Sequence, residues 1–232
     1  MSRNGSSRRS FLKGVGAAVG AGAIGVGASS PAVAASGSFT RVESATQKSI
    51  RAVAQTAEGP YGAANNGDIV ARRMGGWEQS FEKILDAGIE AQGKSFYGAD
   101  ATDDGRNLWA VGESGVAGHY DVVDEEFTDY SQPAGVANTW QDVVATGSAD
   151  AETVQLVDGS GNFVRGTKEG DAMNWESPTT IGGGNTLSAL VGSGDDLWVA
   201  DSTGTVRRST DGGDSWTAIG PDAPVPFYDL AA

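Results

Sequence analysis

The chain carries the segment WAVGESG at residues 109–115, and three more segments of the same kind, YGAANNG at 61–67, QLVDGSG at 155–161 and WVADSTG at 198–204. Each segment runs from small or apolar residues into a turn that ends on glycine. The four last glycines are 48, 46 and 43 residues apart. A repeat of about 45 residues indicates one recurring structural unit.

Each of these segments has an extended stretch on either side. The stretches that follow the turns are 68–71, 116–120, 162–165 and 205–208. The apolar stretches that precede the segments are 50–53, 96–99, 140–145 and 187–191. An aromatic residue then opens the last strand of each unit, at Trp77, Phe127, Trp175 and Trp216. Since glycine readily supplies the positive φ of a hairpin turn, the pattern predicts four antiparallel strands per unit.

Four-stranded units of this length predict an all-β fold, a β-propeller, whose blades pack face to face around an axis. The aromatic residues placed at regular intervals are expected to form the core between blades. The expected blades span residues 49–92, 93–137, 138–184 and 185–222, with part of a fifth at 223–232. Residues 35–48 are expected to hold a linker and an outer strand, at Phe39–Val42.

Residues Pro226–Leu230 are comparable with Ser95–Ala99, so we expect them to form the innermost strand of the fifth blade. The favoured interpretation is an incomplete ring of six or seven blades, and the alternative is a complete ring of four or five. An open ring would expose sheet edges, through which self-association is expected. Phe81, Ile84 and Leu85 also fit a short amphipathic helix, but the repeat favours a strand.

The fourth unit contains Ser209, Asp211, Gly213 and Trp216 in the order SxDxGxxW. We expect the aspartate to accept hydrogen bonds from turn amides, the glycine to permit the bend, and the tryptophan to close the sheet edge. This prediction assigns a structural role to the four residues and no catalytic one. The other units lack the complete pattern.

That segment matches the Asp-box of sialidase-type propellers at every fixed position. Together with LWAVGESG at 108–115 and LWVADSTG at 197–204, it resembles the Asp-box, or BNR-repeat, propellers and the photosystem II assembly-factor family. The resemblance covers nearly all of the chain after residue 34. It implies the propeller fold and a protein-binding role. No binding residue is carried over, because the basic patch of the assembly factors has no counterpart in so acidic a chain.

The first 34 residues differ in composition from the rest, since they hold four basic residues and no acidic one. Ser7–Lys13 includes Arg8 and Arg9 and resembles a twin-arginine export signal, and a weakly apolar glycine- and alanine-rich stretch follows it. Ala32–Ala34 offers small residues for cleavage before Ala35. The resemblance implies export of the folded protein to the outer side of the membrane, with no membrane segment left after cleavage.

After removal of the signal, 12 basic residues face 30 acidic ones, a net charge of −18. Such a charge repels nucleic acid and anionic lipid. It also suggests a halophilic protein, whose self-repulsion is screened by salt, although an ordinary acidic secreted protein is the alternative. The chain has no cysteine, so it can form no disulfide.

The sequence predicts no catalytic site. His119 is the single histidine and is interpreted as structural, and the pairs Asp103–Asp104 and Asp195–Asp196 and the run Asp124–Glu126 are interpreted as solvated charge. Two carboxylates could serve a glycosidase, but a true sialidase would also need an FRIP-like segment, which does not occur. Asp201, Asp211 and Asp214 do not have the spacing of a calcium loop, so we expect no metal and no cofactor.

The first functional hypothesis is an exported, non-enzymatic binding or scaffold propeller for a protein or glycan. The alternatives are a secreted Asp-box glycosidase and an assembly factor for a membrane complex. A ligand is expected at the mouth of the axial channel, near Tyr97, Asp142 and Tyr228.

Overall fold

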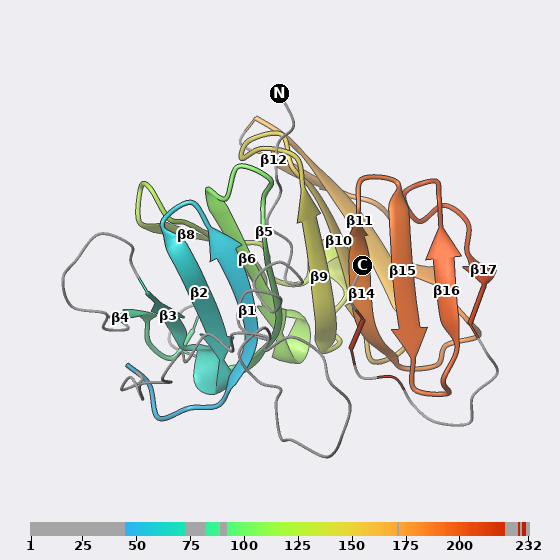
Figure 1. The fold of residues 1–232 in the computed structure, drawn as a ribbon, viewed down its shortest axis with the longest axis horizontal. Helices are drawn as coiled ribbons and strands as arrows, with labels where there is room; N and C mark the ends of the chain where they lie inside the picture. The colour runs from blue at the N-terminus through green and yellow to red at the C-terminus, as the bar shows by residue number, and fades with distance from the viewer. Residues whose placement is uncertain are drawn as a thin grey trace, which may run out of the picture.

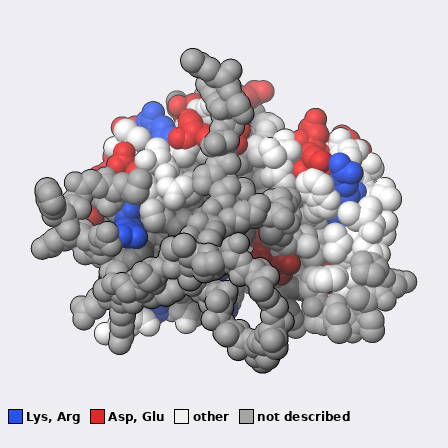
Figure 2. All heavy atoms as spheres, in the orientation of Figure 1, with Lys and Arg blue, Asp and Glu red and all other residues white. Residues whose placement is uncertain are grey.

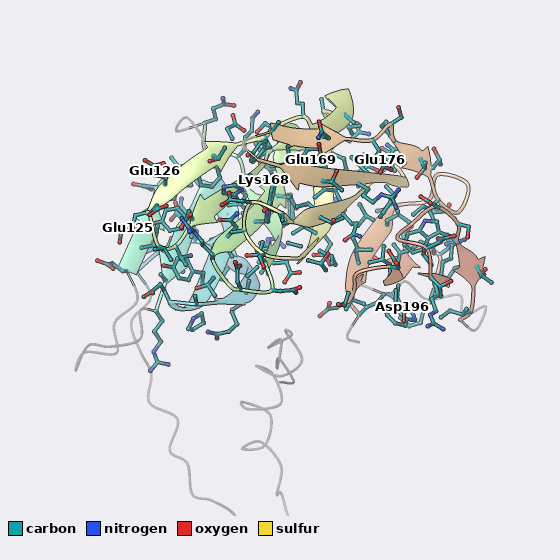
Figure 3. All side chains as sticks on the ribbon, turned by 90° about the horizontal axis from the view of Figure 1, so that it is seen from above. Glu125, Glu126, Lys168, Glu169, Glu176 and Asp196 are labelled. Carbon is teal, nitrogen blue, oxygen red and sulfur yellow. The ribbon has the colours of Figure 1, made fainter. Side chains whose placement is uncertain are left out.

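The computed structural model describes residues 45–72, 82–88, 92–170, 172–220, 227 and 229–230. These residues form four antiparallel sheets that follow one another in chain order (Figure 1). Seen from above, Glu125 and Glu126 lie towards one end of the row of sheets and Asp196 at the other (Figure 3). The expected fold class, an all-β propeller with four-stranded blades, is confirmed.

The strands of each sheet are hydrogen-bonded to one another in the order of the chain. Sheet 1 contains β1 (Ile50–Thr56), β2 (Gly59–Ala64), β3 (Ile69–Ala71) and β4 (Glu82–Leu85). Sheet 2 contains β5 (Phe96–Ala101), β6 (Asn107–Gly112), β7 (Ala117–Asp121) and β8 (Glu126–Asp129). Sheet 3 contains β9 (Trp140–Thr146), β10 (Thr153–Asp158), β11 (Asn162–Glu169) and β12 (Ala172–Trp175), with β13 (Thr179–Thr180) also paired to β11. Sheet 4 contains β14 (Leu187–Ser193), β15 (Asp196–Asp201), β16 (Val206–Ser209) and β17 (Thr217–Ala218).

The innermost strands β1, β5, β9 and β14 contact one another in succession, and the second strand of each sheet contacts the innermost strand of the next. Three apolar clusters fill the spaces between sheets 1 and 2, 2 and 3, and 3 and 4. Trp109 and Trp140 are the largest fully buried side chains, and both belong to the middle cluster. Each sheet therefore buries its apolar residues against its neighbours, as expected for blades.

The last glycines of the four repeated segments all have the predicted positive φ, +75° at Gly67, +77° at Gly115, +83° at Gly161 and +86° at Gly204. The turns also touch the chain that leads to the next blade. A Cβ on Gly67 or Gly161 would lie 2.4 or 2.6 Å from the Cα of Gly88 or Gly184. Backbone angle and space both require glycine at these two turns.

A β-bulge recurs at the second residue of each innermost strand, a feature not predicted from the sequence. The pairing register shifts across Arg51, Tyr97, Gln141 and Ser188. A bulge increases the local twist of a strand. The innermost strands of all four blades therefore twist at the same point.

The outer aromatic residues differ from their predicted positions. Trp175 ends β12 instead of opening it, Trp216 precedes β17, and Phe127 lies inside β8. All three are only partly buried. The fully buried aromatic side chains lie instead on the first and second strands of the blades: Tyr61, Phe96, Trp109 and Trp140. Trp77 lies outside the described residues.

Ile84 and Leu85 belong to β4, so the strand interpretation of this segment is confirmed over its helical alternative. Phe81, the third residue of that pattern, lies outside the described residues.

Several predictions for the two ends of the chain also fall on residues that are not described: Arg8 and Arg9 of the signal, the strand at 39–42, and Tyr228. Phe227, Asp229 and Leu230, the described part of the expected fifth blade, belong to no strand. The Ser188 hydroxyl donates a hydrogen bond to the carbonyl of Phe227, which places that residue beside β14. Within the described ranges, no helix has the length and apolar character needed to cross a membrane.

Candidate functional site

One cross-strand pair recurs at the same register in every blade. It joins the first residue of each repeated segment to its partner on the third strand: Tyr61 with Ala71, Trp109 with His119, Gln155 with Arg165, and Trp198 with Arg208. Side chains of a strand alternate between its two faces. Because Leu108 and Leu197, the residues next to the two tryptophans, pack towards the preceding blade, these pairs lie on the face of the following blade.

Between sheets 1 and 2, the tyrosine of the Tyr61–Ala71 pair contacts an aromatic ring of sheet 2. Tyr61 is 1% exposed, and its ring centroid lies 6.1 Å from that of Tyr120 on β7. This interface has an apolar core in which Phe96 and Ala99 of β5 are fully buried.

Between sheets 2 and 3, aromatic rings and a buried carboxylate surround the Trp109–His119 pair. The Trp109 ring stacks on Tyr130 at 5.3 Å and meets the edge of Trp175, on sheet 3, at 6.2 Å. Glu152 of sheet 3 is buried, and its Oε1 accepts a hydrogen bond of 3.0 Å from Asn107 Nδ2 of sheet 2. This bond joins the two blades through groups that are shielded from water.

His119 lies in the same interface and is buried, with its Nδ1 3.7 Å from Glu152 Oε1. Burial lowers the pKa of His119 from 6.5 to about 4, with a further contribution from the positive charge of Lys168. Asp121 and Asp150 oppose this shift. At neutral pH the imidazole is therefore uncharged.

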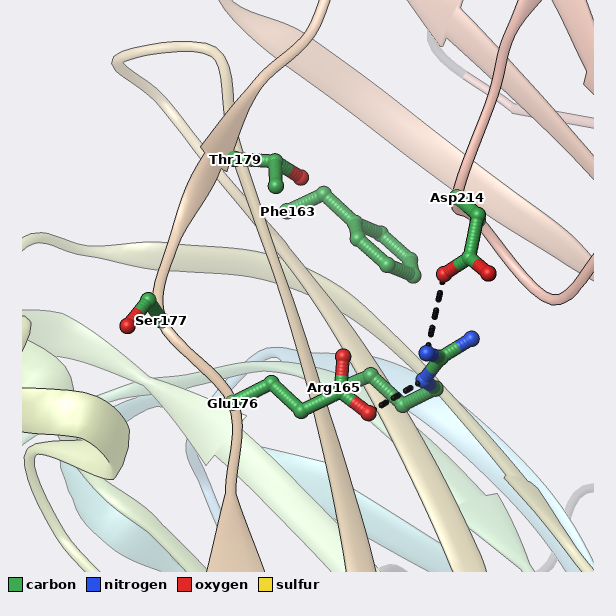
Figure 4. A pocket seen from close by; sticks show the side chains of 7 residues that line it. Phe163, Arg165, Glu176, Ser177, Thr179 and Asp214 are labelled. Atoms are coloured by element: carbon green, nitrogen blue, oxygen red, sulfur yellow. Dashed lines mark hydrogen bonds and ion pairs between the residues drawn. The ribbon is translucent and has the colours of Figure 1, made fainter.

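Between sheets 3 and 4, Arg165 crosses to the turn that follows β16 (Figure 4). Its Nη2 lies 2.9 Å from Asp214 Oδ1, its Nη1 donates to the Gly212 carbonyl at 3.1 Å, and its Nε binds Glu176 Oε1 at 2.8 Å. The hydrogen bond to Glu176 contributes most to the raised pKa of Arg165. The guanidinium therefore donates hydrogen bonds to acceptors of its own blade and of the next blade.

A cavity of about 220 Å³ opens beside Arg165. It is lined by Phe163, Arg165, Glu176, Ser177, Thr179, Gly213 and Asp214. Both carboxylates of this lining form an ion pair with the guanidinium, each through one oxygen. We interpret the cavity as part of the interface between blades 3 and 4.

The four predicted Asp-box residues make one tight turn. Asp211 Oδ1 accepts hydrogen bonds from the Ser209 hydroxyl at 2.7 Å and the Ser215 amide at 2.9 Å. Ser209 Oγ accepts the Gly213 amide at 2.8 Å, and Trp216 Nε1 donates to the Gly213 carbonyl at 3.0 Å. The hydroxyls of Ser215 and Ser209 contribute most to lowering the pKa of Asp211 to about 2. The turn holds Gly212 and Asp214 where Arg165 reaches them.

Gly213 and Trp216 connect this turn to the preceding blade. The Trp216 ring meets Phe163 of sheet 3 edge to face, with centroids 5.4 Å apart. Gly213 has φ +104°, and a Cβ there would lie 2.3 Å from Phe163 Cζ. The turn therefore requires glycine, both for its backbone angle and for the space next to the phenyl ring.

The expected ligand position at the axis needs correction for Asp142. This residue is only 5% exposed, and its Oδ2 accepts the Leu190 amide of the next blade at 3.0 Å, so it joins two innermost strands and does not line an open mouth. Tyr97 is half-buried; its hydroxyl donates to Glu113 Oε1 at 3.1 Å, and the Arg51 guanidinium lies 5.3 Å from the centre of its ring. The third position, Tyr228, is not described.

Two carboxylates that we interpreted as solvated charge are exposed and, in addition, bind protein groups. Asp103 and Asp104 accept the amides of Gly147 and Ala149 on the next blade, at 3.0 and 3.1 Å. Their position in a turn beside the equivalent turn of the next blade is the reason, and a single sequence does not reveal it. Among the described residues, no group of three or more His, Cys, Asp or Glu is arranged to hold a metal.

The fourth pair is the exception in this series, because no following blade covers it within the described part of the chain. Arg208 stacks over Trp198 at 5.1 Å and binds Asp196 through Nε and Nη2 at 2.7 and 2.9 Å. The side chains of Arg208 and Asp196 are 43% and 42% exposed. Basic and acidic atoms lie side by side over β15 and β16 (Figure 2). This open face, Trp198, Arg208 and Asp196, is the candidate binding site.

Comparison with known proteins supports the fold and leaves the family open. No protein-family model matches the chain, and no curated protein matches its sequence. The structure is similar to the WD40 repeats of RRP9 and to U3-55K, both at TM-score 0.60 and 13% identity over 78% of this chain. It is also similar to a chain of a mitotic checkpoint complex, at TM-score 0.59 and 10% identity over 85% of this chain.

The matched region spans only part of each of those chains, 53% of the RRP9 structure, 54% of U3-55K and 61% of the checkpoint chain. At this level of identity the likeness shows the β-propeller fold alone.

Proposed function

We propose that this protein is a non-enzymatic binding propeller that holds its partner on the open face of sheet 4. The carrying observation is the Trp198–Arg208 pair, which occupies the position that every earlier blade uses to bind its neighbour. Tryptophan and arginine are also the residue types that most often dominate binding energy at interfaces. The partner class is a protein or a glycan.

Binding is tested on the purified full chain with Trp198→Ser, and with Val123→Ser as the matched control. Val123 is 56% exposed in a hairpin turn away from the open face. Affinity for protein and glycan candidates should fall at least tenfold for Trp198→Ser and stay unchanged for Val123→Ser. Equal affinities of both variants for a bound partner would refute this face as the site.

The runner-up function is a glycosidase of the Asp-box kind, and an assembly factor for a membrane complex is the third. The ion pairs that Arg165 forms with one oxygen of Glu176 and one of Asp214 favour a structural role of these carboxylates over glycosidase chemistry. Turnover of any aryl glycoside or polysaccharide by the purified chain would favour the glycosidase. Association with a defined membrane complex, lost in Trp198→Ser, would identify the assembly factor.

We further propose that the twin-arginine motif at Arg8 and Arg9 exports the protein to the outer side of the membrane. Replacing both arginines by lysine should retain the chain in the cytosol, and the secreted wild type should begin at Ala35 by intact mass.

A charge of −18 after cleavage leads us to propose adaptation to high salt. The free energy of unfolding should then rise with salt concentration.

A further inference from the structure

Most basic side chains of this acidic protein are paired with a carboxylate, but some of them are not. Among the described Lys and Arg residues, ion pairs are formed by Lys83, Arg106, Arg165, Lys168, Arg207 and Arg208. No ion pair with a described residue is formed by Lys48, Arg51, Arg72 and Lys94. Because 30 acidic residues face 16 basic ones in the chain, an unpaired cation calls for an explanation.

Arg51 and Lys48 lie beside the turn between β2 and β3, at Asn65–Gly67. The Arg51 Nε donates a hydrogen bond of 2.8 Å to Asn65 Oδ1. The carbonyl of Ser49, the residue after Lys48, accepts the Asn65 amide at 3.0 Å. Both basic residues are exposed. The turn thus brings two exposed cations to the same end of blade 1.

Lys94 lies beside the same turn but belongs to the chain that leads into β5 of blade 2. The hydroxyl of Ser95, the next residue, accepts the Asn66 amide at 3.2 Å. A Cβ on Gly93, the preceding residue, would lie 3.1 Å from Asn66 Oδ1. Lys94 itself is half-buried. The turn therefore gathers three unpaired cations from two blades, and we call them the basic cluster: Lys48, Arg51 and Lys94.

Tyr97 orients the arginine of the basic cluster. The Arg51 guanidinium lies 5.3 Å from the centre of the Tyr97 ring, and the Tyr97 hydroxyl donates to Glu113 Oε1 at 3.1 Å. Arg51 and Tyr97 are both bulge residues, and a bulge changes the direction in which a side chain points. Only Nε of the guanidinium has an acceptor among the described residues. Its Nη1 and Nη2 are therefore free to bind a carboxylate of another molecule.

The carboxylates beside this turn are already bound to other groups. Glu113 Oε2 accepts the Ser95 amide at 2.9 Å, and its Oε1 accepts the Tyr97 hydroxyl. Asp68, which follows the turn, is buried and pairs with Lys83 at 3.4 Å. The basic cluster thus has no counter-ion in the described part of the chain, so an external anionic group would supply one.

We propose that the basic cluster is a docking surface for an acidic segment of a partner protein. The arginine fork binds a carboxylate through two hydrogen bonds, and the two lysines add positive charge beside it. Nucleic acid and anionic membranes extend far beyond the cluster and would meet the net negative charge of the whole protein. A short acidic segment meets chiefly the cluster, because at about 0.1 M salt more distant charges are screened over about 10 Å.

The test is fluorescence anisotropy of a labelled hexaglutamate peptide with the full chain at about 0.1 M salt. We expect Arg51→Gln, and Lys48→Gln combined with Lys94→Gln, each to weaken binding at least about tenfold. The two lysines form no side-chain hydrogen bond among the described residues, so the double variant should fold like the wild type.

Arg72→Gln is the matched control for Arg51→Gln, because it removes the same charge from blade 1. Arg72 is also unpaired, but it lies at the opposite end of β3, where its amide donates to the Pro60 carbonyl at 3.0 Å. Its affinity for hexaglutamate should equal that of the wild type. No binding by the wild type, or an equal loss in both variants, would overturn the proposal, since the second result means attraction by overall charge alone.

Other anions serve as competitors. Displacement of the peptide by inorganic phosphate or by a six-nucleotide single-stranded DNA, as effectively as by unlabelled hexaglutamate, would also overturn the proposal, because the cluster would then bind any anion.

This surface is separate from the Trp198–Arg208 face of blade 4. Trp198→Ser should therefore leave hexaglutamate binding unchanged, and Arg51→Gln should leave binding at the blade 4 face unchanged. If Trp198→Ser abolished hexaglutamate binding and Arg51→Gln did not, the acidic segment would be a ligand of the blade 4 face, and the proposal for the basic cluster would be refuted.

Discussion

The Trp109–His119 pair of sheet 2 and the Trp198–Arg208 pair of sheet 4 occupy the same register, yet their surroundings are opposite. Trp109 is fully buried, and a second blade supplies Trp175 and Glu152 around the first pair. The second pair has an exposed arginine held by Asp196. The difference shows that this position of a blade contacts the next blade, and that in sheet 4 no blade of the described part of the chain covers it.

The largest difference between the two regions should appear when the tryptophans are truncated. Trp109→Ala should lower the free energy of unfolding by about 3–5 kcal/mol, because it leaves a cavity in a sealed interface. Trp198→Ala should lower it by about 1 kcal/mol, because this side chain is only partly buried and no described blade covers it. Urea unfolding measures both, and equal losses would mean that the two tryptophans are equally enclosed.

Acidification should affect the sealed pair through His119. A folded-state pKa of about 4 against 6.5 means that the folded protein prefers the neutral imidazole. This contribution is fully present above pH 6.5 and is lost as the pH falls towards 4, a change of about 3 kcal/mol. Urea unfolding between pH 7 and 4 should show this loss in the wild type.

His119→Phe should remove that part of the pH dependence, and it serves as the comparison in the same titration. An unchanged slope in His119→Phe would assign the pH dependence to other groups. Asp201 and Asp211, whose pKa values are lowered to about 2, contribute their stability above the ordinary carboxyl pKa of 3.8 and lose it below that value.

The Asp-box turn should be sensitive to any side chain at Gly213. Gly213→Ala combines a positive φ with a collision against Phe163 and should cost about 1–3 kcal/mol. Gly183→Ala is the matched control, with φ +78° and no atom within 4 Å of its Cβ, and should cost about 1 kcal/mol. Thermal unfolding of both variants separates steric conflict from backbone preference, and a larger loss in the control would refute the contact.

The smallest expected effect on the free energy of unfolding is the difference between Arg165, which binds the next blade, and Arg208, which is partly exposed. Arg165→Gln removes bonds that reach the next blade and should cost about 1–2 kcal/mol. Arg208→Gln removes a partly exposed pair within one blade and should cost at most about 0.5 kcal/mol. Chemical unfolding at matched salt tests this, and an equal cost would mean that crossing the interface adds nothing.

Much of the fold followed from local patterns. The four glycine turns and the strands around them were predictable, since positive φ and alternation of side chains depend on a few neighbouring residues. The bulges at Arg51, Tyr97, Gln141 and Ser188 were not, because no turn residue or spacing marks them. Among the candidate site residues, the turn formed by Ser209, Asp211, Gly213 and Trp216 could be anticipated in its geometry, whereas Asp142 could not be told apart from an axial ligand group.

The amino-acid sequence alone determined the repeat, the class of fold and the acidic character of the protein. The tertiary structure decided which residues join the blades: Asp103 with Gly147, Asp142 with Leu190, and Arg165 with Asp214, separated by 44, 48 and 49 residues. These separations equal about one repeat, so the period was visible in the sequence. The partners were not, because the bonds depend on how far each blade rotates about the axis, and that rotation is set by the packing of whole sheets.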